Sequence, residues 1–160
     1  LLARDRAYEV AITARHPHQR EAAKALELIP LEEGAVEPWA KEREPDVVIE
    51  TVGGTADTID QAIQLCRRGG RIVVEGIFTS PSTVDSLALV LKELDIVGSS
   101  LYGRGERGSE FRGTVESLPR YRGELGTLQT HQFPLNSIQE AFACAADKST
   151  GAIKVTVLPH

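Results

Sequence analysis

The stretch DVVIETVGGTADTIDQAIQLCRRGGRIVVEG, residues 46–76, decides the fold. It opens with an apolar run at residues 46–51 and closes with a second apolar run at residues 71–76. Between the runs, apolar residues recur at the i, i+3, i+4 and i+7 spacing of an amphipathic helix, namely Ile59, Ala62, Ile63 and Cys66. This order of strand, helix and strand predicts a right-handed βαβ unit with two parallel strands.

Similar runs flank this unit on both sides. They predict strands at residues 9–13, 28–31 and 95–99, and helices at residues 17–26 and 86–94. Residues 1–5 resemble the end of a helix. Residues 32–45 are charged and contain two prolines, so we expect a loop with one helical turn at most. The strands lack polar alternation, as buried parallel strands do, and together these elements predict an α/β fold with a doubly wound parallel sheet.

The character of the sequence changes after residue 100, where glycine and charged residues become frequent. This change predicts a boundary between a first part, residues 1–100, and a second part, residues 101–160. In the second part we expect a helix near residues 111–121 and another that ends near Ala146. A last strand is predicted at residues 153–157.

The composition excludes several classes of protein. A net charge of −5 argues against general nucleic-acid binding, which favours basic chains. No stretch approaches the ~20 apolar residues of a membrane span. Cys66 and Cys144 do not have the spacing of metal ligands, and they predict two free thiols in a reducing compartment. We therefore expect a cytoplasmic protein that binds neither nucleic acid nor membrane.

Candidate binding residues follow from the predicted sheet. Ligands of open parallel sheets bind at the carboxyl ends of the strands. In this chain those ends are residues 14–15, 51–54, 76–78 and 98–101. Three of these four ends contain glycine, which lets a flat ligand approach the backbone. Ordinary strand-to-helix turns also favour glycine, so each glycine alone is weak evidence.

The first of these ends carries Ala14 and Arg15, where a dinucleotide-binding sheet usually has an acid. The acid binds the ribose 2′-hydroxyl of NAD, whereas a cation pairs with the 2′-phosphate of NADP. Arg20 lies five residues further on and is a second candidate for the phosphate, with His16 or His18 in support. These residues predict NADP in preference to NAD; the alternative is a solvated turn.

Other polar residues indicate a binding role less specifically. Lys154 is either a point charge near a pyrophosphate or an exposed strand lysine, and His131 is expected to be a packed structural histidine. Glu50 and Glu75 lie in strands and need partners if they are buried; Glu75 is also a candidate contact for a carboxamide. The GxGxxG spacing at residues 103–108 falls in the glycine- and charge-rich stretch after residue 100, outside the predicted βαβ units, and the four histidines and two cysteines do not have zinc-site spacing.

Residues 46–78, 87–103 and 130–157 together resemble the C-terminal half of the zinc-type medium-chain dehydrogenases, which include alcohol, sorbitol and threonine dehydrogenases. The resemblance implies a partial Rossmann domain without the first strand and the glycine-rich loop. It also implies a C-terminal segment that returns to a GroES-like catalytic domain absent from this chain. The strands at residues 9–13 and 46–51 would be the second and fourth of the Rossmann order 3-2-1-4-5-6.

The resemblance also implies cofactor contacts, position by position. Ala14 replaces the acid that binds the adenosine ribose, and the pair Ala14-Arg15 resembles NADP-preferring members. The other implied contacts are Thr51 and Val52 on the adenosine side, the following Gly53, Glu75, Gly76 and Ile77 beside the nicotinamide, Ser99, Ser100 and Leu101 beside its carboxamide, and Lys154 near the pyrophosphate.

The implied function is hydride transfer between an alcohol or polyol, or its carbonyl, and NADP(H). Zinc would be held by ligands outside this chain, which by itself is expected to be inactive and poorly stable. The full-length protein is expected to be a homo-oligomer. Three alternatives stay open: a zinc-free quinone or enoyl reductase of the same superfamily, a non-catalytic NADP(H)-binding protein and, more remotely, a methyltransferase.

Overall fold

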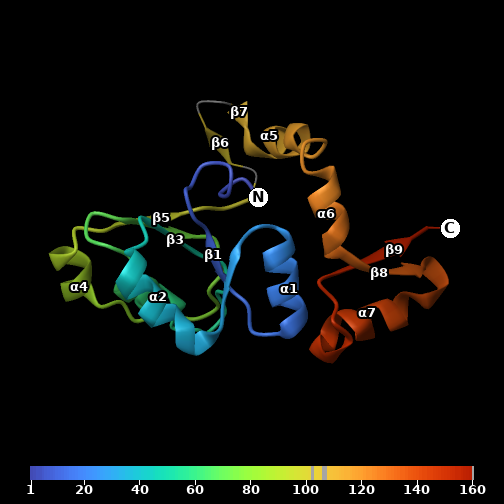
Figure 1. Ribbon diagram of the computed structural model, residues 1–160, viewed down its shortest axis with the longest axis horizontal. Coiled ribbons are helices and arrows are strands. Elements are labelled where there is room, and N and C mark those ends of the chain that lie inside the picture. Colours follow the sequence, from blue (N-terminus) through green and yellow to red (C-terminus); the bar gives the residue numbers. More distant parts are fainter. Residues whose placement is uncertain (102, 106–107, 160) are drawn as a thin grey trace. The chain divides into compact units, whose positions relative to one another are not determined.

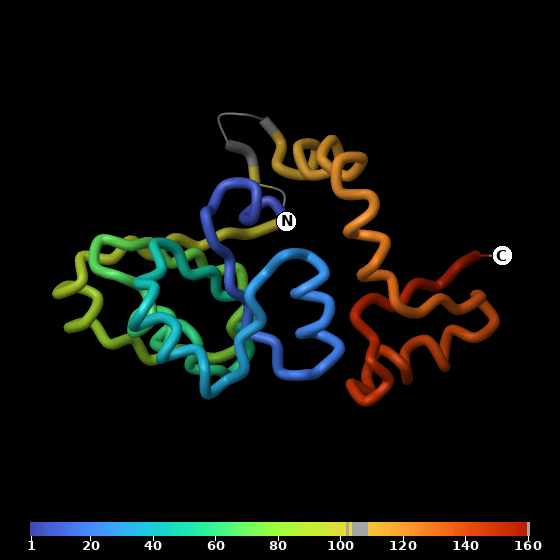
Figure 2. The backbone as a smooth tube through the Cα atoms, in the orientation of Figure 1, coloured from blue at the N-terminus to red at the C-terminus, as the bar shows by residue number. Residues whose placement is uncertain are grey.

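The computed structural model describes residues 1–101, 103–105 and 108–159. The chain divides into two compact units. Unit 1 comprises Leu1–Val36 and Thr114–His160, and unit 2 comprises Glu37–Gly113. Figure 2 traces the chain from unit 1 in blue, through unit 2 in cyan to yellow, and back into unit 1 in orange and red. The boundary that the sequence predicts between residues 1–100 and residues 101–160 stays a prediction.

Unit 2 contains a parallel sheet with the strand order β3-β4-β5 (Figure 1). Its strands are β3 (Val47–Glu50), β4 (Arg71–Val74) and β5 (Asp95–Gly98). The last residues of the three strands are register partners, so their carboxyl ends are level. The predicted strands in this part of the chain are confirmed, each slightly shorter than expected.

Two helices of unit 2 build its core on one face of this sheet. Helix α3 (Thr58–Leu65) packs on β3 and β4, and α4 (Ser86–Leu91) packs against α3. The Asp85 carboxylate caps α4 by accepting from the N–H of Ala88 at 2.9 Å. The fully buried cluster is Ala62, Ile63, Cys66 and Ile72. The i, i+3, i+4 spacing therefore identified the buried face of α3 correctly.

The opposite face of the sheet is apolar and open. Val47 and Ile49 on β3 are 52% and 49% exposed, and Val97 on β5 is 45% exposed. These side chains point away from α3, because successive residues of a strand alternate between the two faces. Unit 2 therefore buries one face of its sheet and exposes the other.

One expectation for residues 32–45 was wrong. In place of a loop, a short 3₁₀ turn η1 (Glu33–Ala35) leads into α2 (Val36–Arg43). Pro38 lies in the first turn of α2, where backbone N–H groups have no intrahelical acceptor, so the proline is tolerated. Ala40 is buried and anchors the helix. The helix ends before Glu44, which has a positive φ of 48° and precedes Pro45.

Unit 1 begins with a second parallel pair. Strands β1 (Ala11–Thr13) and β2 (Ile29–Leu31) are joined through α1 (Pro17–Ala25), as predicted. The expected helix end at residues 1–5 is instead a set of turns. These turns keep helix-like hydrogen bonds, such as Asp5 N–H to the Leu1 carbonyl at 3.2 Å, but are too short for a helix.

The C-terminal half of unit 1 is a third parallel pair. Strands β8 (Gln129–Pro134) and β9 (Lys154–Leu158) flank α7 (Ile138–Ala146), which packs on both (Figure 1). Helix α7 and β9 were predicted, but β8 was not. Its residues QTHQFP contain no long apolar run, and the pairing with β9 makes this stretch a strand.

The connection to this C-terminal half contains two short strands and two helices. The predicted helix near residues 111–121 is α5 (Glu110–Ser117), whereas α6 (Arg122–Leu128) was not predicted, because its two glycines lower helix propensity. The remaining elements are β6 (Arg104–Gly105), β7 (Gly108–Ser109), η2 (Leu135–Ser137) and η3 (Lys148–Thr150). Tyr102, Glu106 and Arg107, in the glycine-rich stretch, lie outside the described residues.

Candidate functional site

The predicted contact residues lie where the parallel strands end. Ala14 follows β1, Thr51 follows β3, Glu75 follows β4 and Ser99 follows β5. Ala14, Arg15, Arg20 and Lys154 belong to unit 1, and the others to unit 2. The site is therefore described as two groups.

In unit 1, Ala14 is buried and extends the pairing of β1 with β2, because its N–H donates to the Leu31 carbonyl at 2.8 Å. Arg15 is exposed, and its guanidinium binds no other residue in the part of the chain that the structure describes. Its guanidinium is thus available to an anion at the end of β1.

Arg20 lies in α1 and holds the turn that carries Arg15. Its Nη1 donates to the Arg15 carbonyl at 3.0 Å and to the Ala14 carbonyl at 3.4 Å, while its Nε lies 3.3 Å from Glu32. The side chain is only 25% exposed. Of the two candidate arginines, Arg20 already binds the backbone of the turn, and Arg15 does not.

The histidines of this turn stack on each other. The rings of His16 and His18 have centroids 5.5 Å apart and an interplanar angle of 7°. The His16 N–H donates to the Gln19 side chain at 3.0 Å, which closes the first turn of α1. Lys154 is exposed at the start of β9, and its carbonyl accepts from Thr130 at 3.3 Å.

In unit 2, the Glu50 carboxylate organises the loop after β3. Its Oε1 accepts from the N–H groups of Val52 at 2.7 Å and Gly53 at 3.0 Å, and from the Thr58 hydroxyl at 2.8 Å. Glu50 is 4% exposed. Burial raises the pKa of this carboxyl, but the hydrogen bonds from Gly53, Thr58 and Val52, together with the nearby N–H of Gly76, lower it by more. Glu50 is therefore ionised in the folded chain.

The ends of β3 and β4 form one continuous edge. The Gly54 N–H donates to the Ile77 carbonyl at 2.8 Å, and the Thr79 N–H donates to the Gly54 carbonyl at 3.0 Å. A Cβ on Gly53, whose φ is +62°, would lie 2.5 Å from the Ile77 carbonyl oxygen. A Cβ on Gly76 would lie 2.3 Å from Glu50 Oε2. The two glycines are thus required by a close approach of the two strand ends.

Apolar side chains project from this edge into solvent. Val52 is 66% exposed and Ile77 is 79% exposed, and Leu101 beyond β5 is 78% exposed. Thr51, Glu75, Ser99 and Ser100 are also exposed. The edge combines a rigid backbone with exposed apolar side chains, which suits a flat ligand that is itself partly apolar.

Sequence reasoning did not place Glu50 in the site. The available signal was an acid at the end of an apolar strand, directly before Thr51 and two glycines, since a buried acid requires donors. His131 lies in β8, half-buried, with its Nδ1 3.0 Å from the Thr130 hydroxyl. This location agrees with a structural role.

A separate hollow of about 560 Å³ lies at the C-terminal end of α3. Two of its cations already have partners: Arg67 binds Asp46 at 2.6 Å, and Lys92 donates to the carbonyls of Ile63, Gln64 and Cys66 at 2.7–3.0 Å. Lys92 thereby caps the end of α3. The hollow lies away from the strand ends and is not the candidate site.

Neither a metal centre nor a membrane span is found in the described part of the chain. Among residues 1–101, 103–105 and 108–159, no three His, Cys, Asp or Glu side chains gather as metal ligands would. Cys66 and Cys144 are free, as expected, with Cys66 buried. None of the described helices is both long and apolar enough to cross a bilayer.

Comparisons with known proteins agree on one family of proteins. A family model described as zinc-binding dehydrogenase matches residues 1–118. An alcohol dehydrogenase of Cupriavidus necator is 30% identical over 117 residues, which cover 72% of this chain and 31% of that protein. The chain therefore spans about a third of the length of this relative.

Two solved structures share the fold. The Escherichia coli CFT073 alcohol dehydrogenase rspB, complexed with NADH, has a TM-score of 0.77 at 21% identity, covering 93% of this chain and 44% of that one. Haloferax mediterranei glucose dehydrogenase, in complex with NADP, Zn and gluconolactone, has a TM-score of 0.71 at 19% identity, covering 93% of this chain and 43% of that one. At these identities the structures show the fold alone.

Proposed function

Because the chain belongs to the zinc-binding dehydrogenase family, we propose that it forms the NADP(H)-binding half of an alcohol or polyol dehydrogenase. The resemblance of its sequence to the zinc-type medium-chain dehydrogenases is confirmed by the family match over residues 1–118. The reaction would be reversible hydride transfer between the carbinol carbon of the substrate and the nicotinamide ring.

The observation that carries this proposal is the joined edge of β3 and β4. Val52 and Ile77 project from a backbone held by Glu50 and by two closely packed glycines, Gly53 and Gly76. A dinucleotide lying across the carboxyl ends of a parallel sheet needs such a surface. Val52 would face the adenosine side, and Ile77 would face the nicotinamide side.

The choice of NADP(H) rests on the end of β1. Ala14 offers no carboxylate to repel a 2′-phosphate, and the exposed Arg15 offers a guanidinium that no other described residue binds. Arg20 contributes by holding the turn through the Ala14 and Arg15 carbonyls. We therefore assign the phosphate contact to Arg15 and a supporting role to Arg20.

This chain's own residues supply binding and orientation. When bound, a nicotinamide dinucleotide supplies or accepts the hydride. The residues that the structure describes do not fit a catalytic zinc, since no three potential ligands gather, and no step through a metal is assigned to them. We also propose a cytoplasmic location, supported by the free thiols, and a homo-oligomer, supported by the exposed edge strand β5.

The test uses the complete chain that the gene encodes. Binding of NADPH and NADH is titrated by nicotinamide fluorescence for the parent, for Arg15→Ala and for Arg6→Ala, an exposed arginine of the same unit. We expect NADPH to bind about tenfold more tightly than NADH, a margin of about 1.4 kcal/mol, and only Arg15→Ala to lose the margin.

Equal affinity for NADH and NADPH in the parent would overturn the choice of cofactor and leave the dehydrogenase proposal standing. Turnover is then assayed with secondary alcohols, polyols and their carbonyl forms. Tight dinucleotide binding with no turnover on any of them would favour a non-catalytic NADP(H)-binding protein. No affinity for either dinucleotide would overturn the proposal as a whole.

A further inference from the structure

We infer that Glu50 is a positioning residue for the dinucleotide, because its carboxylate holds the loop after β3 and the end of β4 as one edge. The inference rests on the proposed function, since it assigns a role within the same binding edge. Glu50 would not touch the cofactor; it would act through Val52, Gly53 and Gly76.

The first argument is the concentration of hydrogen bonds on one oxygen atom. Glu50 Oε1 accepts from Val52, Gly53 and Thr58, all within 3.0 Å. The loop therefore curls around a side chain that precedes it by only two or three residues. Thr58 begins α3, so the same oxygen also fixes the loop to the start of that helix.

The second argument is that Glu50 reaches both strand ends. Its backbone carbonyl accepts from the N–H groups of Glu75 at 2.8 Å and Gly76 at 3.1 Å. Its Oε2 faces Gly76 so closely that a Cβ there would lie 2.3 Å away. Side chain and main chain of one residue thus set the spacing between the ends of β3 and β4.

The third argument is that this arrangement lowers the stability of the fold. Glu50 Oε2 is buried and has no hydrogen-bond partner among the described residues, and the N–H of Gly76 beside it donates to the Glu50 backbone carbonyl. An unpaired buried carboxylate oxygen lowers stability. A hydrogen-bonded arrangement that lowers the stability of the fold but fixes the backbone at a ligand-binding edge is typical of a preorganised site.

The consequence for binding follows from pre-organisation. Val52 and Ile77 present their side chains to solvent, at 66% and 79% exposure. If the loop is loosened, the ligand must order it on binding, and affinity falls. Glu50→Gln replaces one carboxylate oxygen with an NH2 group, and it removes the charge that strengthens the bonds from Val52 and Gly53.

The experiment compares Glu50→Gln and Thr58→Val with the parent in the complete chain. Glu42→Gln is the matched control, because its side chain is 75% exposed and lies in the same unit. Two quantities are measured at a temperature where every variant is folded. They are the dissociation constant for the dinucleotide that the parent prefers, and amide hydrogen exchange along β3, β4 and the loop.

We expect Glu50→Gln to weaken dinucleotide binding about tenfold or more and Thr58→Val to weaken it a few-fold. The amides of Val52 and Gly53 should exchange faster in both variants, while those of Ile72 and Val74 stay as protected as in the parent. Glu42→Gln should match the parent in both measurements.

Parental affinity in Glu50→Gln, despite faster exchange in the loop, would overturn the inference and leave the proposed function intact. If Glu50→Gln does not fold, the test rests on Thr58→Val. Parental affinity for the dinucleotide in Thr58→Val would then overturn the inference. A parent chain that binds neither NADH nor NADPH would instead remove the proposed function, and the inference with it.

Discussion

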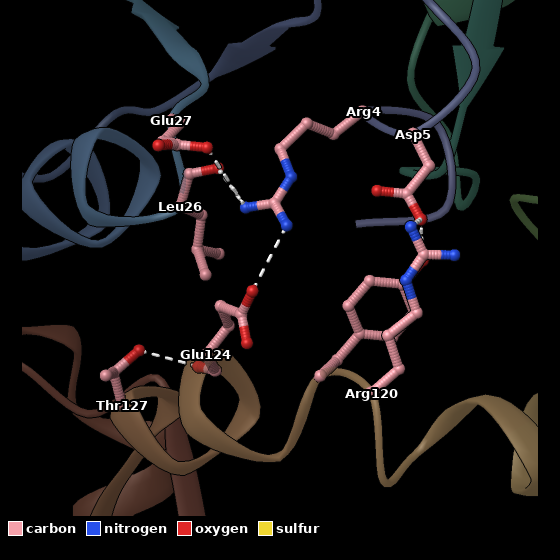
Figure 3. Close-up of polar contacts among 8 residues, drawn as sticks. Arg4, Asp5, Leu26, Glu27, Arg120, Glu124 and Thr127 are labelled. Carbon is pink, nitrogen blue, oxygen red and sulfur yellow. Dashed lines mark hydrogen bonds and ion pairs between the residues drawn. The ribbon is translucent and has the colours of Figure 1, made fainter.

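The hydroxyl of Tyr121 donates a hydrogen bond to the carboxylate of Asp5, 116 residues earlier in the chain. Arg120 adds an ion pair to the same carboxylate at 2.8 Å (Figure 3) and places its guanidinium 5.3 Å from the Tyr121 ring centroid. Nearby, Arg4 pairs with Glu124 at 3.1 Å and donates to the Leu26 carbonyl at 3.2 Å. The first turns of unit 1 are thereby bound to the segment that begins α6.

The first prediction concerns the stability of this attachment. Tyr121 is only 3% exposed, so Tyr121→Phe keeps the packed ring and removes one donor from Asp5. We expect the thermal unfolding midpoint to fall by a few degrees. Tyr8→Phe is the control, because Tyr8 is fully exposed and should leave the midpoint unchanged. Equal midpoints for all three chains would mean that the contact contributes nothing to stability.

The second prediction concerns pH. The hydrogen bond from Tyr121 lowers the pKa of Asp5 below its ordinary 3.8, helped by the charges of Arg120 and Arg4 and opposed by burial. A carboxyl with a depressed folded pKa stabilises the fold above the unfolded pKa, and this contribution is lost as pH falls through the folded pKa. Asp5→Asn should therefore be less stable than the parent near neutral pH. Denaturant titrations should show this difference shrinking below about pH 4; a constant difference would contradict the assignment.

The third prediction distinguishes the role of Arg20 from that of Arg15. Arg20 binds the carbonyls of Ala14 and Arg15 and lies beside Glu32, so Arg20→Ala should loosen the turn. We expect Arg20→Ala to reduce stability by about 1 kcal/mol and to weaken NADPH and NADH binding together. Arg15→Ala should instead weaken only NADPH binding. Parallel titrations with both dinucleotides check this, and a selective loss of NADPH binding in Arg20→Ala would reverse the assignment.

The fourth prediction compares the two faces of the β3-β4-β5 sheet. Ile72 is fully buried against α3, whereas Ile49 on the opposite face is 49% exposed. Ile72→Ala should cost about 2–5 kcal/mol of unfolding free energy, because it opens a cavity. Ile49→Ala should cost less than about 1 kcal/mol. Chemical denaturation of both variants measures the contrast; similar losses would mean that the open face is covered in solution.

The fifth prediction uses two neighbouring glycines. Gly53 and Gly54 have φ values of 62° and 68°, so alanine is strained at both, by about 1–2 kcal/mol. Only at Gly53 would the new Cβ also collide with the Ile77 backbone, 2.5 Å away, while Gly54 faces open space. Gly53→Ala should therefore be the more destabilising, and it alone should weaken dinucleotide binding. The pair is compared by thermal unfolding and by titration.

Much of the fold was predictable because its signals are local. The apolar spacing through Ile59, Ile63 and Cys66 identified the buried face of α3, and short β-rich runs identified the strands beside it. Helix α2 was missed because Pro38 was taken as a breaker, although it lies in the first turn. Strand β8 was missed because its strand conformation depends on pairing with β9, 20 residues or more away.

The sequence by itself determined the alternation of strands and helices, the parallel pairing of the strands, and the glycines at the ends of β3 and β4, since these depend on periodicity and on neighbouring residues. Only the tertiary structure decided which charged groups are already occupied. It showed that Arg20 holds a turn, that Glu50 clamps a loop, and that Asp5 meets Tyr121. The physical reason is that a hydrogen bond depends on distances of about 3 Å between atoms, and such distances between remote residues are set by packing, which no local pattern records.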